Sequence, residues 1–144
     1  MTMDYTPNIA PDKMGKNAIQ AVQNVKKDLF SIGISAEIGI TPMIGVNDHV
    51  PEVFTFQNAQ QVLTFANQDS NVVELSMWSL GRDMPCPGAA TGGAASPSCS
   101  GVAQQAYKFT KFFSKFTGNS KVPIPLPKFQ PPPRSRPTPG LQPS

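Results

Sequence analysis

A chain of 144 residues has room for one domain of ordinary size. Its formal charge of +3 is uneven, because residues 1–83 hold all nine acidic groups and five Lys or Arg, whereas residues 84–144 hold seven basic groups and no acid. No apolar run approaches the ~20 residues that a bilayer span needs, and residues 1–16 lack the apolar core of a signal peptide. We therefore expect no membrane partner and no transmembrane segment.

The first predicted helix spans residues 13–31, where four apolar residues at spacings of four, three and four form one face: Ala18, Val22, Val25 and Leu29. Asp12 is placed to cap this helix. A buried strand with a proline-induced irregularity is predicted over residues 38–46, and it ends at the polar pair Asn47 and Asp48.

A second helix is predicted to begin after Thr55, which can cap it, with an apolar face made by Ala59, Val62, Leu63 and Ala66. The next strand is predicted over residues 72–78, an apolar and β-branched run that ends in the only Trp. Its alternation gives two faces: Val73, Leu75 and Met77 on one, and Glu74, Ser76 and Trp78 on the other. Trp78 at a strand's carboxyl end lies where α/β folds bind ligands, and its flat ring can stack on a sugar. A Trp that fills the core is the alternative.

Two cysteines, Cys86 and Cys99, bracket a loop that is poor in large apolar residues. A disulfide closing this loop stabilises the fold by about 3 kcal/mol on the chain-entropy model and favours an oxidising compartment. Metal binding is the weaker alternative, because two thiols without neighbouring His or Cys fall short of a zinc set. His49 is expected to be a solvated loop residue, and no metal or cofactor site is expected. Arg82 and Asp83 are predicted to form a salt bridge that orders the cysteine loop.

A third amphipathic helix is predicted before Gly118, with an apolar face made by Val102, Ala106, Phe109, Phe113 and Phe116. The Lys residues of 108–115 share this helix and are expected to form its solvated face, so we expect no nucleic-acid partner. From Val122 onward nine of the 23 residues are Pro, and residues 119–144 are predicted to be an extended linker or disordered tail.

If Met1–Tyr5 ends a preceding strand, the chain reads βαβαβα with parallel strands and right-handed crossovers. The predicted fold class is α/β, with residues 1–118 forming three βα units of a partial TIM-type (β/α) barrel. Three units leave one face of the sheet uncovered and two edges open. The ends of the strands would bring a set of polar and aromatic side chains to one rim: Asp4, Tyr5, Asn47, Asp48 and Trp78.

Three strings carry a family resemblance: Met-Thr-Met-Asp-Tyr at 1–5, Thr-Pro-Met-Ile-Gly-Val-Asn-Asp at 41–48, and Leu-Ser-Met-Trp-Ser-Leu-Gly-Arg-Asp at 75–83. Together with the two cysteines, they resemble the last three βα units of a bacterial or fungal chitinase of glycoside hydrolase family 18, over roughly residues 1–117. The resemblance implies a secreted enzyme that hydrolyses β-1,4-linked N-acetylglucosamine with retention, the substrate's own 2-acetamido oxygen acting as nucleophile. The tail resembles the linkers that tether such enzymes to binding modules.

Five residues take substrate-binding roles from this resemblance. Asp4 matches the substrate-contacting Asp of the family's sixth strand, and Tyr5 lies two residues beyond the slot of a Tyr that steadies the acetamido group. Trp78 matches the eighth-strand Trp that forms the floor of the subsite holding the distorted sugar. Asn47 and Asp48 could bind sugar hydroxyls, or instead serve only in the turn that follows their strand.

The family's general acid ends a D-x-x-D-x-D-x-E motif, and this string does not occur in the sequence. Without the acid the mechanism loses about two to four powers of ten, so the chain alone is predicted to be inactive. Two alternatives remain: a non-catalytic, lectin-like module that binds chitooligosaccharides, and an adaptor whose Pro-x-x-Pro elements bind an SH3-type groove. Because an open barrel face is left uncovered, we expect self-association or binding of the missing barrel half.

Overall fold

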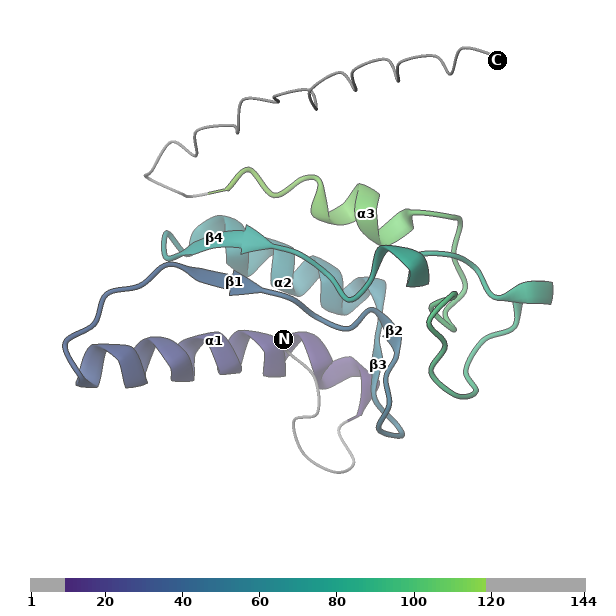
Figure 1. Ribbon diagram of the computed structural model, residues 1–144, viewed down its shortest axis with the longest axis horizontal. Coiled ribbons are helices and arrows are strands. Elements are labelled where there is room, and N and C mark those ends of the chain that lie inside the picture. The colour runs from purple at the N-terminus through teal and green to yellow at the C-terminus, as the bar shows by residue number, and fades with distance from the viewer. Residues whose placement is uncertain (1–9, 119–144) are drawn as a thin grey trace, which may run out of the picture.

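The computed structural model describes residues 10–118 and shows a mixed α/β fold (Figure 1). The strand expected over Met1–Tyr5, with Asp4 and Tyr5, lies outside the described residues, and so does the tail predicted over 119–144. No helix in the described part is long and apolar enough to pass through a bilayer.

Two parallel strands form the centre of the fold, β1 (Ile38–Ile40) and β4 (Val72–Leu75). Ile40 pairs with Leu75, and a parallel bridge between Met43 and Trp78 continues the pairing beyond both strands. This confirms the predicted parallel arrangement of the segments around residues 40 and 75. A crossover through a helix is the connection that parallel neighbours require.

The single strand predicted over residues 38–46 is wrong, because the segment makes two pairings. After β1, the short strand β2 (Gly45–Val46) turns away and pairs antiparallel with β3 (Val53–Phe54). Pro42 lies between the two parts and has no N–H to donate to a continuous ladder. The hairpin closes with the N–H of Asn47 donating to the carbonyl of Glu52 at 3.0 Å.

Two long helices flank β1 in the sequence, α1 (Met14–Ser31) and α2 (Phe56–Gln68). The predicted cap of α2 is confirmed, since the Thr55 hydroxyl accepts from the N–H of Asn58 at 3.4 Å. The predicted cap of α1 is wrong: a 3₁₀ turn at Pro11–Lys13 precedes the helix, and no side chain caps it. All four residues predicted for the apolar face of α2 are buried. Of the four predicted for α1, Ala18 and Val22 are buried, Leu29 is half-buried and Val25 is exposed.

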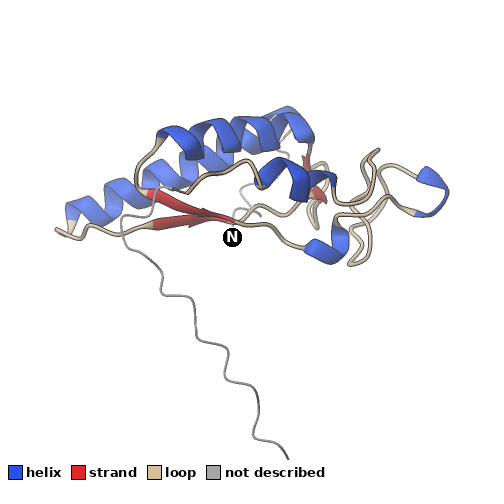
Figure 2. Ribbon diagram, turned by 90° about the horizontal axis from the view of Figure 1, so that it is seen from above, coloured by secondary structure: helices blue, strands red, loops and turns tan. Residues whose placement is uncertain are grey.

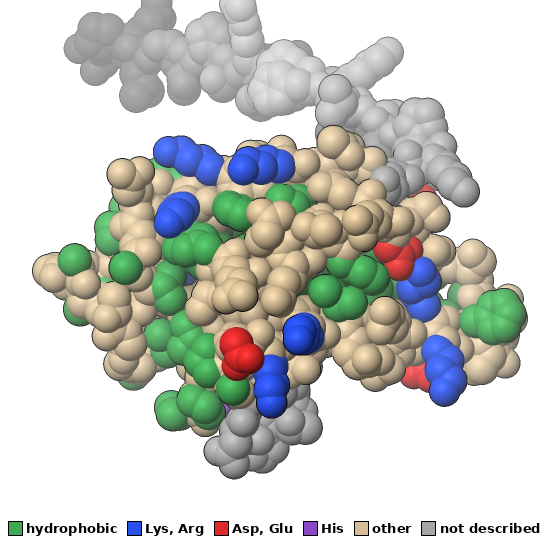
Figure 3. Space-filling model, turned by 180° about the vertical axis from the view of Figure 1, so that it is seen from behind, with side chains coloured by type: hydrophobic (Ala, Val, Ile, Leu, Met, Phe, Trp, Pro, Cys, Tyr) green, Lys and Arg blue, Asp and Glu red, His purple; other side chains and the backbone are tan. Residues whose placement is uncertain are grey.

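The third helix, α3, is shorter than predicted and spans Lys108–Phe113. Val102 and Ala106 lie in the loop before it, because Tyr107 adopts a left-handed conformation with φ 59° that starts the helix only at the next residue. The division of its faces is as predicted, with Phe109 and Phe113 buried and the lysines exposed. Figure 3 shows Lys and Arg side chains gathered along the edge over α3, with hydrophobic side chains in separate patches.

The α-helices α1, α2 and α3 lie on one side of β1 and β4, and the opposite face of these strands carries none of the three (Figure 2). An apolar cluster fills the space between helices and strands: Met14, Ala18, Val22, Ile38, Ile40, Ile44, Phe54, Ala59, Val62, Ala66, Val72, Phe109 and Phe113. Within it the ring of Phe109 stacks on Phe56, with ring centroids 4.2 Å apart. The core therefore belongs to the helix side, and the other face of the strands is left to carry polar side chains.

Candidate functional site

Trp78 lies just beyond the carboxyl end of β4, and its side chain is 51% exposed. Its N–H donates to the carbonyl of Pro42 at 2.9 Å, and its own carbonyl accepts from the N–H of Ile44 at 3.0 Å. A cis peptide bond joins it to Ser79. The backbone is therefore held from the β1 side while the indole remains open, so among the described residues Trp78 does not fill the core.

The face of the strands opposite the helices is polar and leads to Trp78. Ser76 shares a hydrogen bond of 2.7 Å between its hydroxyl and that of Thr41. Glu74 of β4 pairs with Gly39 of β1. The two residues are close, since a Cβ added to Gly39 would lie 3.4 Å from the Cβ of Glu74. On the helix side, Leu75 and Met77 pack against the core. The predicted alternation is thus confirmed for residues 74–78. It is wrong for Val73, because a register shift between β1 and β4 skips Val73, and Val72 is the residue that packs in the core.

Asn47 and Asp48 follow β2 directly and lie in different surroundings. The Asn47 side chain is buried, and its Nδ2 donates to the carbonyls of Met43 at 3.1 Å and Gly45 at 2.8 Å. Its Oδ1 is also buried and accepts no hydrogen bond from the described residues. Asp48 is exposed in the turn of the hairpin. The Asn47 amide therefore stabilises the 43–45 segment, which contains Ile44, a backbone partner of Trp78. The carboxylate of Asp48, in contrast, is open to solvent.

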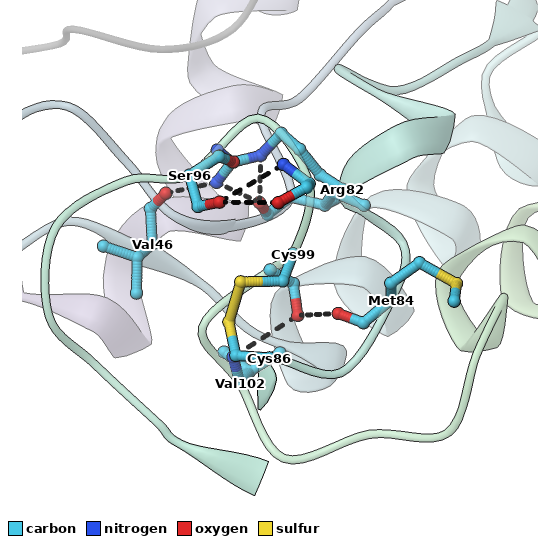
Figure 4. Close-up of a disulfide and its surroundings, with 10 residues drawn as sticks. Val46, Arg82, Met84, Cys86, Ser96, Cys99 and Val102 are labelled. Carbon is cyan, nitrogen blue, oxygen red and sulfur yellow. Dashed lines mark hydrogen bonds between the residues drawn. A yellow bond between two sulfur atoms is a disulfide. The ribbon is translucent and has the colours of Figure 1, made fainter. Parts of the chain in front are cut away.

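Arg82 is a buried cation whose hydrogen-bond partners are backbone carbonyls. Its Nε and Nη2 donate to the carbonyl of Ile44 at 3.3 and 3.0 Å, and the same guanidinium donates to the carbonyls of Val46 and Ser96 (Figure 4). Burial lowers the pKa of Arg82, and the negative charge of Asp48 opposes that shift. Arginine keeps its charge in proteins, so these carbonyls receive charge-assisted hydrogen bonds.

Asp83 is equally buried and binds the start of α3. Its Oδ1 accepts from the N–H of Phe109 at 3.0 Å, and its Oδ2 accepts from the N–H and the hydroxyl of Thr110, both at 2.7 Å. The predicted Arg82–Asp83 salt bridge is therefore wrong: the described residues hold these two side chains against separate backbone groups. A carboxylate at a helix N-terminus satisfies N–H groups that have no partner within the helix.

The predicted disulfide between Cys86 and Cys99 is present, with 5.0 Å between the two Cα atoms (Figure 4). Beside it, the N–H of Ser100 donates to the carbonyl of Met84 at 3.1 Å, and the carbonyl of Ser100 accepts from Val46 at 2.7 Å. The cysteine loop, residues 86–99, is thus tied to β2 next to the segment that bears Trp78.

Metal-ligating side chains do not gather in the described part of the chain: residues 10–118 contain no group of three or more His, Cys, Asp or Glu that could hold an ion. His49 is exposed in the hairpin turn. The groups available at this site are the open ring of Trp78, the hydroxyls of Thr41 and Ser76, and exposed carboxylates. Such a set suits a neutral polyhydroxylated ligand.

No protein-family model matches this sequence. Among curated proteins, a probable bifunctional chitinase/lysozyme of Escherichia coli K12 is 33% identical over 134 residues, which cover 81% of this chain and 14% of that protein. Endochitinase 11 of Metarhizium anisopliae is 35% identical over 99 residues, covering 59% of this chain and 19% of the fungal protein.

Solved structures agree with these relatives. Catalytic-site mutants of active domain 2 of the Pyrococcus furiosus chitinase match with a TM-score of 0.67 and 39% identity, covering 81% of this chain and 38% of that one. The chain belongs to the chitinase-like glycoside hydrolases. Structures of that archaeal domain with chito-oligosaccharides match the chitinase-like chain with a TM-score of 0.66 and 38% identity over 80% of its length. The chain spans well under half of each relative it matches.

The strand that carries Trp78 follows from the local sequence pattern, whereas the backbone contacts of Arg82 and Asp83 do not. Trp78 and its strand were singled out from the alternation of one apolar run. Arg82 and Asp83 were noticed, yet their partners lie 14 to 38 residues away in the sequence, where no local pattern points to them. The sequence itself shows only that Arg82 and Asp83 are adjacent charges shortly after an apolar strand, which does not identify the backbone groups they bind.

Proposed function

We propose that this chain forms part of the sugar-binding surface of a family 18 glycoside hydrolase acting on β-1,4-linked N-acetylglucosamine. The observation that carries the proposal is Trp78, an indole 51% exposed just past the carboxyl end of β4, with its backbone fixed on the β1 side. Aromatic rings bury a large apolar area with little loss of conformational freedom, and the C–H face of a pyranose is a matching surface.

The barrel assignment is part of the same proposal. Parallel β1 and β4 with helices on one side only are the arrangement of neighbouring units in a (β/α) barrel, whose ligands bind at the carboxyl ends of the strands. The polar face with Glu74, Ser76 and Thr41 would then line the interior below Trp78. We infer that the chain supplies the last three βα units, with Asp4 and Tyr5 contributing from the first of them.

The isolated chain is proposed to bind sugar without cleaving it. A retaining glycosidase needs a carboxylic acid beside the scissile oxygen, and the D-x-x-D-x-D-x-E string that provides it in this family is absent from the sequence. Glu74 is exposed on the polar face, but it lies four residues before Trp78, well below the strand end. A lectin-like role is the second candidate, and this same observation favours it. The disulfide supports secretion into an oxidising compartment.

The binding test is a titration of the full chain with N-acetylglucosamine oligomers, followed by the fluorescence of Trp78 and by calorimetry. Binding is expected, and Trp78→Ala should lower the affinity at least tenfold, equivalent to about 1.4 kcal/mol. The matched control is Phe30→Ala, which removes an aromatic side chain that is 84% exposed at the end of α1. Unchanged affinity in Trp78→Ala, or an equal loss of affinity in both variants, would show that Trp78 is not the surface on which the sugar stacks.

Turnover is measured separately with a reducing-end assay on the purified chain. No release of N-acetylglucosamine or its dimer is expected. If oligomers are cleaved and Glu74→Gln abolishes the cleavage, Glu74 is the acid and the non-catalytic proposal is wrong. Cleavage that survives Glu74→Gln would point to an acid among the other carboxylates of the chain and would contradict the proposal equally.

A further inference from the structure

The 78–82 segment, which follows β4, is fixed at both ends on one residue of the neighbouring chain segment, Ile44. At the first end, the carbonyl of Trp78 accepts from the N–H of Ile44 at 3.0 Å. At the second end, the guanidinium of Arg82 donates to the carbonyl of Ile44, from Nε at 3.3 Å and from Nη2 at 3.0 Å. Ile44 is itself buried in the apolar core. The backbone that carries the indole is therefore held from both ends on one rigid point of the fold.

The cysteine loop, residues 86–99, lies against the same segment. The guanidinium of Arg82 also donates to the carbonyl of Ser96 in this loop (Figure 4). The next residue of the loop is close as well, since a Cβ added to Gly81 would lie 3.3 Å from the carbonyl oxygen of Pro97. The loop thus presents two successive carbonyl groups to the segment. One planar guanidinium, with donors in a fixed geometry, joins the loop to the anchor of the indole.

The cysteine loop has little apolar packing of its own to hold this position. Of residues 86–99, all of which are described, Cys99 alone is buried. The residues between the cysteines are Gly, Ala, Ser, Thr and Pro, which bury little apolar area. The disulfide joins Cys86 to Cys99 and closes the loop at its base. Because a disulfide restricts the conformations that a closed loop can adopt, it keeps the carbonyls of Ser96 and Pro97 beside their partners.

We propose that the disulfide and Arg82 position Trp78 for sugar binding, although neither group contacts the sugar. The disulfide keeps the cysteine loop against Arg82, and Arg82 keeps the 78–82 segment on Ile44. A ring that is held in its orientation before binding loses less conformational entropy on binding than a mobile ring. Opening the disulfide therefore increases the motion of the indole and lowers the affinity for N-acetylglucosamine oligomers while the fold is retained. The effect on affinity rests on the proposed function, whereas the effect on the motion of the indole does not.

The test compares the full chain with the double variant Cys86→Ser/Cys99→Ser. The sequence contains no other cysteine and no Trp besides Trp78, so the change and the fluorescence signal each belong to one site. Time-resolved fluorescence anisotropy measures the amplitude of the subnanosecond motion of the indole, and calorimetry measures the affinity for N-acetylglucosamine oligomers. We expect an amplitude of fast motion about twofold larger in the double variant. Binding should be about fivefold weaker, equivalent to about 1 kcal/mol.

Two further variants separate positioning from general stability. Arg82→Lys keeps the charge and the disulfide, but one ammonium cannot serve the carbonyls of Ile44 and Ser96 with the geometry of the planar guanidinium. It should therefore increase the indole motion and weaken binding in the same direction as the double variant. The control, Val62→Ala, removes two methyl groups from a buried residue of α2 and destabilises the core away from the 78–82 segment. It should leave both the indole motion and the affinity unchanged, at a temperature where far-UV circular dichroism shows every variant to be folded.

The positioning role is overturned if the double variant keeps the indole motion of the parent chain, or if that motion rises while the affinity stays unchanged. Equal effects in Val62→Ala and the double variant would overturn it as well, because general destabilisation would then account for both. Failure of the proposed function is a different result, in which the parent chain itself binds no sugar oligomer. In that case the anisotropy of Trp78 alone decides whether the disulfide and Arg82 hold the indole.

Discussion

The side chains of Arg82 and Asp83 follow one another in the chain but bind separate segments. The guanidinium of Arg82 donates to carbonyls of the 44–46 segment and to Ser96, whereas the carboxylate of Asp83 accepts from the first N–H groups of α3. These two residues thus join the end of the Trp78 strand to the β2 hairpin, the cysteine loop and the third helix. Opposite charges side by side need not form a salt bridge when backbone groups offer several hydrogen bonds to each.

Arg82→Met is expected to lower the free energy of unfolding by about 2–4 kcal/mol, because three backbone carbonyls lose their charge-assisted donor in a buried site. Arg82→Lys should recover only part of this, since one ammonium cannot reproduce the planar fork. Urea unfolding followed by Trp78 fluorescence measures the change. The control is Lys27→Met, which removes an exposed cation from α1. Equal effects of the two Met variants would contradict the assigned role.

Asp83→Asn is expected to destabilise the fold by about 1–3 kcal/mol, because one of its two oxygens becomes a donor and faces backbone N–H groups. The loss should appear first in α3, as faster amide exchange at Phe109 and Thr110, while amides of α2 remain protected. Asp28→Asn removes the same charge from an exposed position of α1 and serves as control. A uniform rise of exchange across α2 and α3 would show that Asp83 does not act through the helix start.

The acid side of the stability profile should depend on Asp69. Burial alone would raise the pKa of Asp69, but two hydrogen bonds from Lys26, one from the N–H of Asn71 and the charge of Lys26 together hold it below its ordinary value. A depressed pKa means that the native state favours the carboxylate. This contribution is full above the ordinary pKa of about 4 and is lost as the pH falls through the lower native value.

Asp69→Asn should therefore lower stability near pH 7 by at most about 1 kcal/mol, since Lys26 is partly solvated. The difference between the variant and the parent chain should shrink as the pH falls below 4. Thermal unfolding from pH 2 to 7 measures it, with Asp12→Asn, a substitution at an exposed carboxylate without a capping bond, as control. A difference that stays constant down to pH 2 would mean that the ion pair contributes nothing.

The sequence contained most of the fold where the pattern is local. Thr55 and the apolar spacing after it predicted α2, the alternation at 74–78 predicted which side chains face the helices, and two cysteines around a weakly apolar loop predicted the disulfide. Prediction failed where distant contacts decide the conformation. The hairpin after Pro42 depends on contacts with the 96–100 segment, and α3 begins where Asp83 binds its N–H groups rather than where the apolar spacing starts. Local periodicity carries no information on either contact.

Gly45 shows how strongly one distant contact restricts the chain below Trp78. It has a φ of 73°, and a Cβ added there would stand 1.9 Å from the carbonyl oxygen of Ser100. Gly33 has the same φ of 73° with no atom within 4 Å of its added Cβ, so the two glycines separate the cost of the backbone conformation from that of the collision. Gly33→Ala should cost about 1–2 kcal/mol. Gly45→Ala should cost clearly more, about 3–5 kcal/mol, because Ser100, directly after the cysteine loop, must move away from β2. Denaturant unfolding compares them, and equal costs would show that the contact between Gly45 and Ser100 yields without loss.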